Sequence, residues 1–250
     1  MDSTRRYSIA TGTLFLVATA SALVADALRP DLSGPTYLTE VAAHPTRLAV
    51  SALFYLLAAG TSVGIAIAMY PVLRAVGGAL AVGSVVFRTV EAVFYVAAVV
   101  SLLSLLPLAR QVAAAPGTAP GDERATLRIL ADSLVSPRDH MTIVGVLAFG
   151  AGAFLYYVLL FRARLVPRWL SGWGVVAVLL IMTACVLSVF RDTSVTGYVP
   201  LILPIGVQEI VLGIWLLARG FTSPIPAALP PDTPPFPDRT GATTTLPSPG

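Results

Sequence analysis

Leu48 to Leu73 reads LAVSALFYLLAAGTSVGIAIAMYPVL, which is 26 residues without a charged side chain. The hydrocarbon core of a bilayer is about 30 Å thick, and about 20 apolar residues in a helix cross it. Backbone groups inside lipid must find their hydrogen bonds within the spanning element itself, which a helix allows. We therefore predict a transmembrane helix in this stretch.

Five further runs extend the same pattern along the chain. Three are uncharged and two carry internal charges, yet all are long and apolar. None alternates polar and apolar residues with a period of two, which argues against a β-barrel. The sequence thus predicts an all-α, polytopic membrane protein with six transmembrane helices in one bundle and one domain over residues 1–221. The predicted spans are about 7–27, 48–71, 78–106, 141–161, 169–190 and 198–219.

Composition supports a membrane protein and excludes other classes. Hydrophobic residues make up 56% of the chain, charged residues only 12%, and the mean hydropathy is +0.82. A soluble globular enzyme carries about twice this share of charge, and a disordered chain far fewer apolar residues. The single cysteine excludes a disulfide framework and a cysteine-based zinc site.

The basic residues point to a lipid bilayer as the partner and not to nucleic acid. The net charge is +3 and the isoelectric point is about 9.3, but the arginines stand singly between apolar runs. The positive-inside rule explains that distribution. Short connections at one side lack acidic residues, so we predict cytoplasmic N and C termini in a bacterial plasma (inner) membrane. The arginines that set this orientation are Arg5, Arg6, Arg74, Arg162, Arg164, Arg168 and Arg219.

Three segments lie outside this simple pattern. The first span follows Arg5-Arg6 and ends in small residues, so a cleaved signal peptide is an alternative interpretation. Residues 113–121 are rich in Ala, Pro and Gly and predict an irregular loop, after which Asp122 begins a short amphipathic helix separate from the fourth span. Residues 222–250, rich in Pro and Thr, predict a disordered cytoplasmic tail.

Four polar residues lie within the predicted spans. Arg88 and Glu91 are three residues apart and therefore share a helix face, while Gln208 and Glu209 lie in the sixth span. A charge at the bilayer centre costs about 2.5–3.5 kcal/mol on insertion scales. We therefore predict that Arg88, Glu91, Gln208 and Glu209 form one buried cluster. It serves either as a polar clamp between helices or as a site for a ligand, ion or proton.

A second polar group is predicted near the outer face. Its residues are Asp26, Glu40, His44, Asp139 and His140. Their spacing matches no strong metal motif, so no metal or cofactor is assigned. The chain also lacks a Gly-x-Ser-x-Gly elbow, a phosphate loop and a His-Glu-x-x-His motif. No catalytic residue is assigned, and the sequence leans away from an enzyme.

The sequence as a whole also resembles a known family. In its order of motifs the chain is similar to the bacterial membrane family labelled domain of unknown function 4386, over most of residues 3–221. That resemblance implies membership and topology, and no activity. The residues that carry it are Ser3-Thr4-Arg5-Arg6, Gly12 to Leu16, His44, Arg47, Ala68 to Leu73, Phe87 to Ala92, Arg164 to Leu170, Gly172-Trp173-Gly174 and Pro204 to Trp215.

Three classes of function fit these observations. The first is binding or transport of a small amphiphile, lipid or ion through the buried Arg/Glu cluster. The second is a structural or accessory membrane subunit without chemistry of its own. The third is an intramembrane enzyme that modifies a lipid. The sequence leaves open a homodimer or a partner membrane protein.

Overall fold

The computed structural model describes residues 3–32, 34, 36–114, 121–191 and 195–222. These residues form helices and contain no β-strand, so the predicted all-α class is confirmed. The predicted tail lies outside the described residues, apart from Thr222. The helices are α1 (Ser3–Leu28), α2 (Tyr37–Ala43), α3 (Pro45–Leu103), α4 (Leu105–Ala114), α5 (Gly121–Ala163), α6 (Arg168–Arg191), the 3-10 helix η1 (Val195–Tyr198) and α7 (Val199–Ala218).

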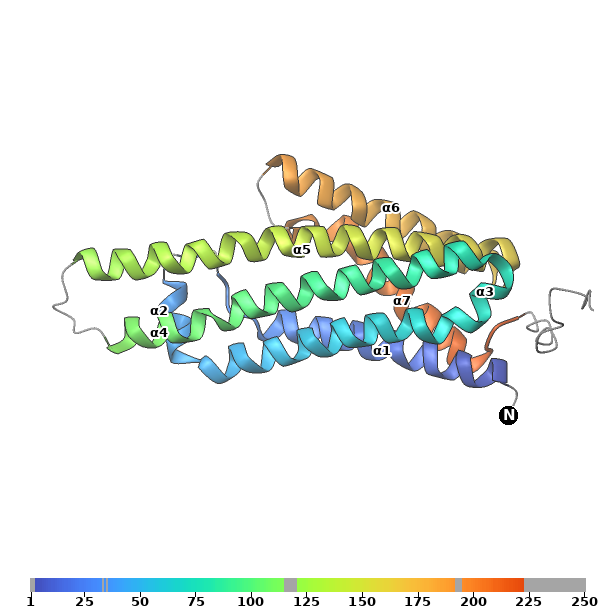
Figure 1. Cartoon of the computed structure of the whole chain (residues 1–250), viewed down its shortest axis with the longest axis horizontal. Helices are drawn as coiled ribbons and strands as arrows, with labels where there is room; N and C mark the ends of the chain where they lie inside the picture. Colours follow the sequence, from blue (N-terminus) through green and yellow to red (C-terminus); the bar gives the residue numbers. More distant parts are fainter. Residues whose placement is uncertain (1–2, 33, 35, 115–120, 192–194, 223–250) are drawn as a thin grey trace, which may run out of the picture.

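Helix α3 contains the second and third predicted runs and folds back on itself (Figure 1). Gly77 has non-helical backbone angles (φ −167°, ψ 87°) and marks the reversal. A Cβ at Gly77 would lie 2.8 Å from Leu159 Cδ2, so α5 approaches the bend closely. The two arms, residues 45–76 and 78–103, therefore pack against each other as a hairpin. Among the described residues, five helical segments are long and apolar enough to cross a membrane. One of these segments, Pro45–Ala114, contains both arms of the hairpin.

Helix α5 differs from the sequence-based expectation. The predicted short helix after Asp122 and the predicted fourth span form one helix of 43 residues, about 64 Å long at 1.5 Å per residue. Pro137 lies inside this helix without ending it. The expectation of two separate elements was therefore wrong. Figure 1 shows α5, α4 and α2 extending beyond the ends of α1 and α6.

The arrangement of helices creates two apolar cores. The larger core joins α1, α3, α5, α6 and α7, and includes the fully buried Phe15, Met69 and Tyr156. The smaller core lies where α2 and α4 pack beside α3 and α5, and includes Leu38 and Leu105. Tyr37 connects α2 to α5 by donating a hydrogen bond to Asp132 Oδ1 at 2.8 Å. Burial, and then this hydrogen bond, raises the pKa of Tyr37, so its hydroxyl remains a donor.

Both described ends of the chain lie at the same end of the molecule (Figure 1). Arg5 donates hydrogen bonds to the Leu216 and Leu217 carbonyl oxygens, at 3.3 and 2.6 Å, and so satisfies acceptors at the carboxyl end of α7. The helices also touch closely: a Cβ on Gly12 would lie 2.7 Å from the Gly213 carbonyl oxygen.

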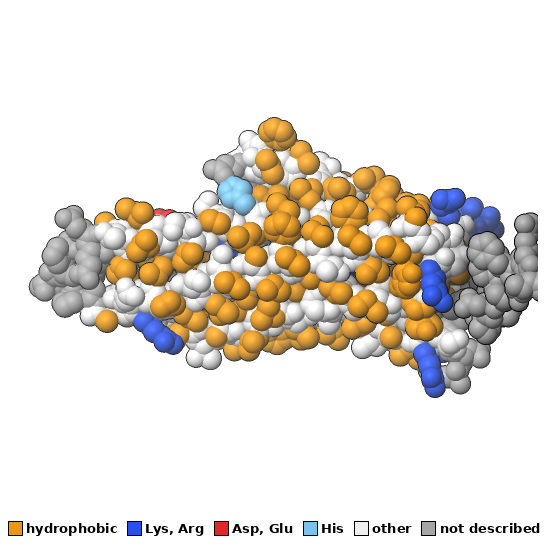
Figure 2. All heavy atoms as spheres, in the orientation of Figure 1, with side chains coloured by type: hydrophobic (Ala, Val, Ile, Leu, Met, Phe, Trp, Pro, Cys, Tyr) orange, Lys and Arg blue, Asp and Glu red, His pale blue; other side chains and the backbone are white. Residues whose placement is uncertain are grey.

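Apolar and basic side chains occupy different parts of the exposed surface. Apolar side chains such as Leu53, Val93 and Phe190 are more than half exposed, and apolar residues cover the middle of the face in Figure 2. Basic side chains gather at the end that holds the N terminus. We call this end the arginine end, since helix ends and bends place Arg5, Arg74, Arg162, Arg168 and Arg219 there. The opposite end is the far end.

Candidate functional site

Arg88 and Glu91 form a buried ion pair on the second arm of α3. Arg88 Nη1 lies 3.2 Å from Glu91 Oε2, and the two side chains are 2% and 6% exposed. Ser62 on the first arm donates its hydroxyl to Glu91 Oε2 at 2.7 Å. Arg88 Nε in turn donates to the Ser62 carbonyl oxygen at 3.4 Å. The pair therefore clamps the two arms of the hairpin together.

Helix α5 completes the surroundings of Arg88. The guanidinium carbon lies 4.7 Å from the centre of the Phe149 ring, which is a cation–π contact. A Cβ on Gly152 would lie 3.2 Å from Arg88 Cγ, so α5 is close to α3 at this level. Arg88 thus contacts both arms of α3 and also α5.

Glu209 on α7 faces the same region without joining the ion pair. Its Oε2 accepts a hydrogen bond from Thr19 Oγ1 on α1 at 3.3 Å, whereas its Oε1 is buried without a partner. Arg88 and Glu209 attract each other electrostatically. Within the described chain, however, no ion pair within 4.0 Å joins them.

Gln208 belongs to a different group of contacts. It is fully buried, accepts a hydrogen bond from the Tyr157 hydroxyl on α5, and donates Nε2 to the Leu170 carbonyl oxygen on α6 at 3.2 Å. Gln208 therefore links α5, α6 and α7. The four residues that the sequence groups together are thus divided between the Arg88–Glu91–Ser62 clamp, Gln208 with its own partners, and Glu209.

The five residues of the predicted outer-face group also separate. Asp26 and Asp139 line one cavity, described below. Glu40, His44 and His140 are exposed and do not line it, and His140 Nδ1 contacts its own helix at the Ser136 carbonyl oxygen, at 2.8 Å. Among the described residues, no three His, Cys, Asp or Glu side chains are grouped as metal ligands would be.

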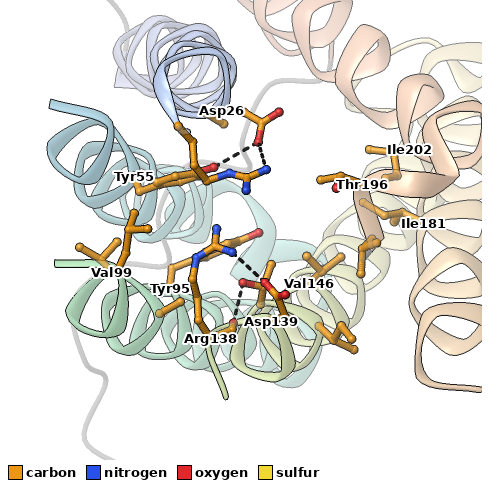
Figure 3. A pocket seen from close by; sticks show the side chains of 17 residues that line it. Asp26, Tyr55, Tyr95, Val99, Arg138, Asp139, Val146, Ile181, Thr196 and Ile202 are labelled. Atoms are coloured by element: carbon orange, nitrogen blue, oxygen red, sulfur yellow. Dashed lines mark hydrogen bonds and ion pairs between the residues drawn. The ribbon is translucent and has the colours of Figure 1, made fainter. Parts of the chain in front are cut away.

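The cavity lies toward the far end, where α1 ends, and its volume is about 260 Å³. One wall comes from α1, α3 and α5 and carries the charged residues among apolar ones; Figure 3 shows Asp26, Tyr55, Arg138 and Asp139 there, beside Val99 and Val146. The facing wall is mostly apolar and comes from α6, η1 and α7. Its residues include Ile181, Val195, Thr196 and Ile202.

Two Arg–Asp pairs lie in the wall that carries the charged residues. Arg29 Nη2 lies 3.2 Å from Asp26 Oδ1, and Arg138 Nη1 lies 2.7 Å from Asp139 Oδ1. Tyr55 also donates its hydroxyl to Asp26 Oδ1, at 3.3 Å. Burial lowers the pKa of Arg29, but attraction to Tyr55 and Asp26 raises it overall, so this guanidinium stays charged.

Exposure differs sharply within each pair. The arginine side chains are 21% and 11% exposed, whereas their aspartate partners are 54% and 44% exposed. Water therefore reaches the carboxylates more than it reaches the guanidinium groups. The cavity presents partly buried positive charge and half-exposed negative charge.

Four residues that line this cavity are ones that the sequence did not assign to a site. They are Arg29, Arg138, Tyr55 and Tyr95. A signal for the arginines was available, because Arg29 follows Asp26 at helical spacing and Arg138 adjoins Asp139. The tyrosines gave no such signal, because each stands alone in an apolar run.

Comparison with known proteins gives one match. The model of the family described as Domain of unknown function (DUF4386) matches residues 10–220, which include both groups of polar residues. No match was found among curated proteins or among solved structures.

Proposed function

This chain belongs to the DUF4386 family of proteins with a domain of unknown function, and from its own geometry we propose that it is a membrane protein that binds a small amphiphile. The observation that carries the proposal is the cavity near the end of α1. A wall with two Arg–Asp pairs among apolar residues faces a mostly apolar wall, and the volume of about 260 Å³ lies just below the usual range for small-molecule sites. An amphiphile matches both walls at once.

The proposed topology has six membrane crossings, because each arm of α3 counts as one. The first arm has 32 residues and the second 26, so each exceeds the roughly 20 residues that a bilayer core requires. The arginine end then faces the cytoplasm by the positive-inside rule, with both chain termini there. A bacterial inner membrane fits this orientation.

In this proposal the Arg88–Glu91–Ser62 clamp holds helices and does not bind the amphiphile. Each member of the clamp already has a partner on a neighbouring arm, and both charged side chains are almost fully buried. The cavity is lined instead by Asp26 and Asp139 of the predicted outer-face group. The site thus shifts from the centre of the bundle toward the far end.

The test uses purified full-length protein in bilayer discs of phosphatidylcholine. Water-soluble probes with a hexyl chain and a phosphate, carboxylate, trimethylammonium or hydroxyl head are titrated by calorimetry. We expect at least one probe to bind with one molecule per chain. Ala22→Phe should abolish that binding, because Ala22 lines the cavity and a larger side chain there reduces its volume.

The matched control is Ala20→Phe, an exposed position on the same helix that does not line the cavity. It should bind the probe as the wild type does. If no probe binds to the wild-type protein, or if both variants bind equally well, the amphiphile proposal is wrong. An accessory subunit would then be the better interpretation.

A further inference from the structure

We infer that the cavity takes an amphiphile with a phosphate-bearing head group, a conclusion that rests on the proposed function and names its ligand class. The juxtaposition that carries it is Arg29 at the end of α1 and Arg138 in α5, two guanidinium groups lining one cavity against an apolar wall. The ligand is identified by this chemistry alone.

The first step concerns free donors. A guanidinium has five N–H groups, and each Asp–Arg ion pair here uses one guanidinium nitrogen. Arg29 Nε is buried and has no hydrogen-bond partner. An unpaired buried donor is costly, and an acceptor from a ligand would satisfy it.

The second step concerns the sign of the charge. Arg29 and Arg138 are near enough to repel each other, so an anion between them relieves that repulsion. The two aspartates balance the formal charge of the two arginines. Their carboxylates, however, are about half exposed, and the guanidinium groups are not. Water screens the negative charges more strongly, and the cavity therefore favours an anion.

The third step concerns shape. The two guanidinium groups come from separate segments of the chain, so they can meet different oxygens of a tetrahedral phosphate, which offers several acceptors. A planar carboxylate has only two oxygens to share between them. The apolar residues opposite, such as Ile181 and Ile202, then contact the first part of the chain. The volume suits a head group with a short apolar segment, and it is too small for a whole phospholipid.

The experiment compares head groups on the same hexyl chain. We expect hexyl phosphate to bind at least tenfold more tightly than hexanol, hexanoate and hexyltrimethylammonium. Arg29→Gln and Arg138→Gln should each weaken hexyl phosphate roughly ten- to a hundredfold, because each removes charged hydrogen bonds. The control is Arg128→Gln, which breaks an exposed Arg–Asp pair on the same helix α5, away from the cavity, and should change nothing.

Asp139→Asn separates ligand binding from a structural role. The substitution replaces a negative charge beside Arg138 with a neutral amide, so the affinity for hexyl phosphate should rise several-fold. A pair that served only to stabilise the fold would give no such gain. Asp139 is about half exposed, so the variant is expected to fold.

Each result has a distinct meaning. If hexanol binds as tightly as hexyl phosphate and Ala22→Phe blocks both, the cavity binds amphiphiles and the phosphate inference is wrong. Equal binding of hexanoate or hexyltrimethylammonium overturns it likewise. If inorganic phosphate binds as tightly as hexyl phosphate, the site takes a free anion and the amphiphile proposal fails. Unchanged affinity in both arginine variants overturns the inference as well.

Discussion

Ser62 donates its hydroxyl to the Glu91 carboxylate at 2.7 Å, across the two arms of one helical hairpin. The bond is buried and joins residues 29 positions apart. It gives Glu91 a second partner besides Arg88, which a buried carboxylate needs if its charge is to be tolerated. The clamp therefore joins the two arms of α3 at this level.

The first prediction concerns this clamp. Arg88→Leu should lower the free energy of unfolding by about 3–5 kcal/mol, because it leaves the Glu91 carboxylate buried without its ion-pair partner. The double variant Arg88→Leu/Glu91→Leu should recover much of that loss, since no unpaired charge remains. Chemical unfolding in detergent micelles measures both. A double variant less stable than Arg88→Leu would contradict a purely structural clamp.

The second prediction ranks the two carboxylates. Glu91→Gln should destabilise the protein more than Glu209→Gln, because Glu91 has an ion pair at 3.2 Å and a short hydrogen bond. Glu209 has one hydrogen bond, from Thr19 at 3.3 Å, and a second oxygen without a partner. The same unfolding assay compares the two variants with the wild type. If Glu209→Gln is the more damaging, then Glu209 makes an interaction with Arg88 stronger than the structure indicates.

The third prediction concerns Gln208. Gln208→Leu should cost about 1–3 kcal/mol, because it leaves the buried Tyr157 hydroxyl without its acceptor. Tyr157→Phe should cost a similar amount by leaving Gln208 Oε1 unpaired. The double variant should cost clearly less than the sum of the two, which a double-mutant cycle measures. Strict additivity would show that this hydrogen bond contributes nothing to stability.

The fourth prediction uses two glycines in helices. Gly12→Ala should destabilise the protein by about 1–3 kcal/mol, because the new Cβ would lie 2.7 Å from the Gly213 carbonyl oxygen and force α1 away from α7. Gly60→Ala meets nothing within 4 Å and should stabilise α3 by about 0.5–1 kcal/mol. Equal effects of the two substitutions would show that α1 and α7 are not in close contact.

The sequence predicts the long apolar helices well because long apolar stretches are a local signal. It also predicts the Arg88–Glu91 pair, since residues three apart share a helix face. It does not reveal that α5 continues through Pro137, because charged residues before Met141 resemble a loop when read alone. The cavity is harder still, since Arg29 and Arg138 are over a hundred residues apart and meet only because α1 and α5 both pack against α3.

The last prediction tests whether each arm of α3 crosses the membrane. In a Cys185→Ala background, single cysteines are placed at His44, Val76 and Ser104, which precede the hairpin, lie next to its bend and follow it. If both arms cross, an impermeant maleimide added to intact bacterial cells labels the cysteines at positions 44 and 104. The cysteine at position 76 should react only after the membrane is opened, because the arginine end faces the cytoplasm in the proposed topology. Labelling at position 76 alone in intact cells would reverse the orientation, and equal labelling of all three would mean that the hairpin does not cross the membrane.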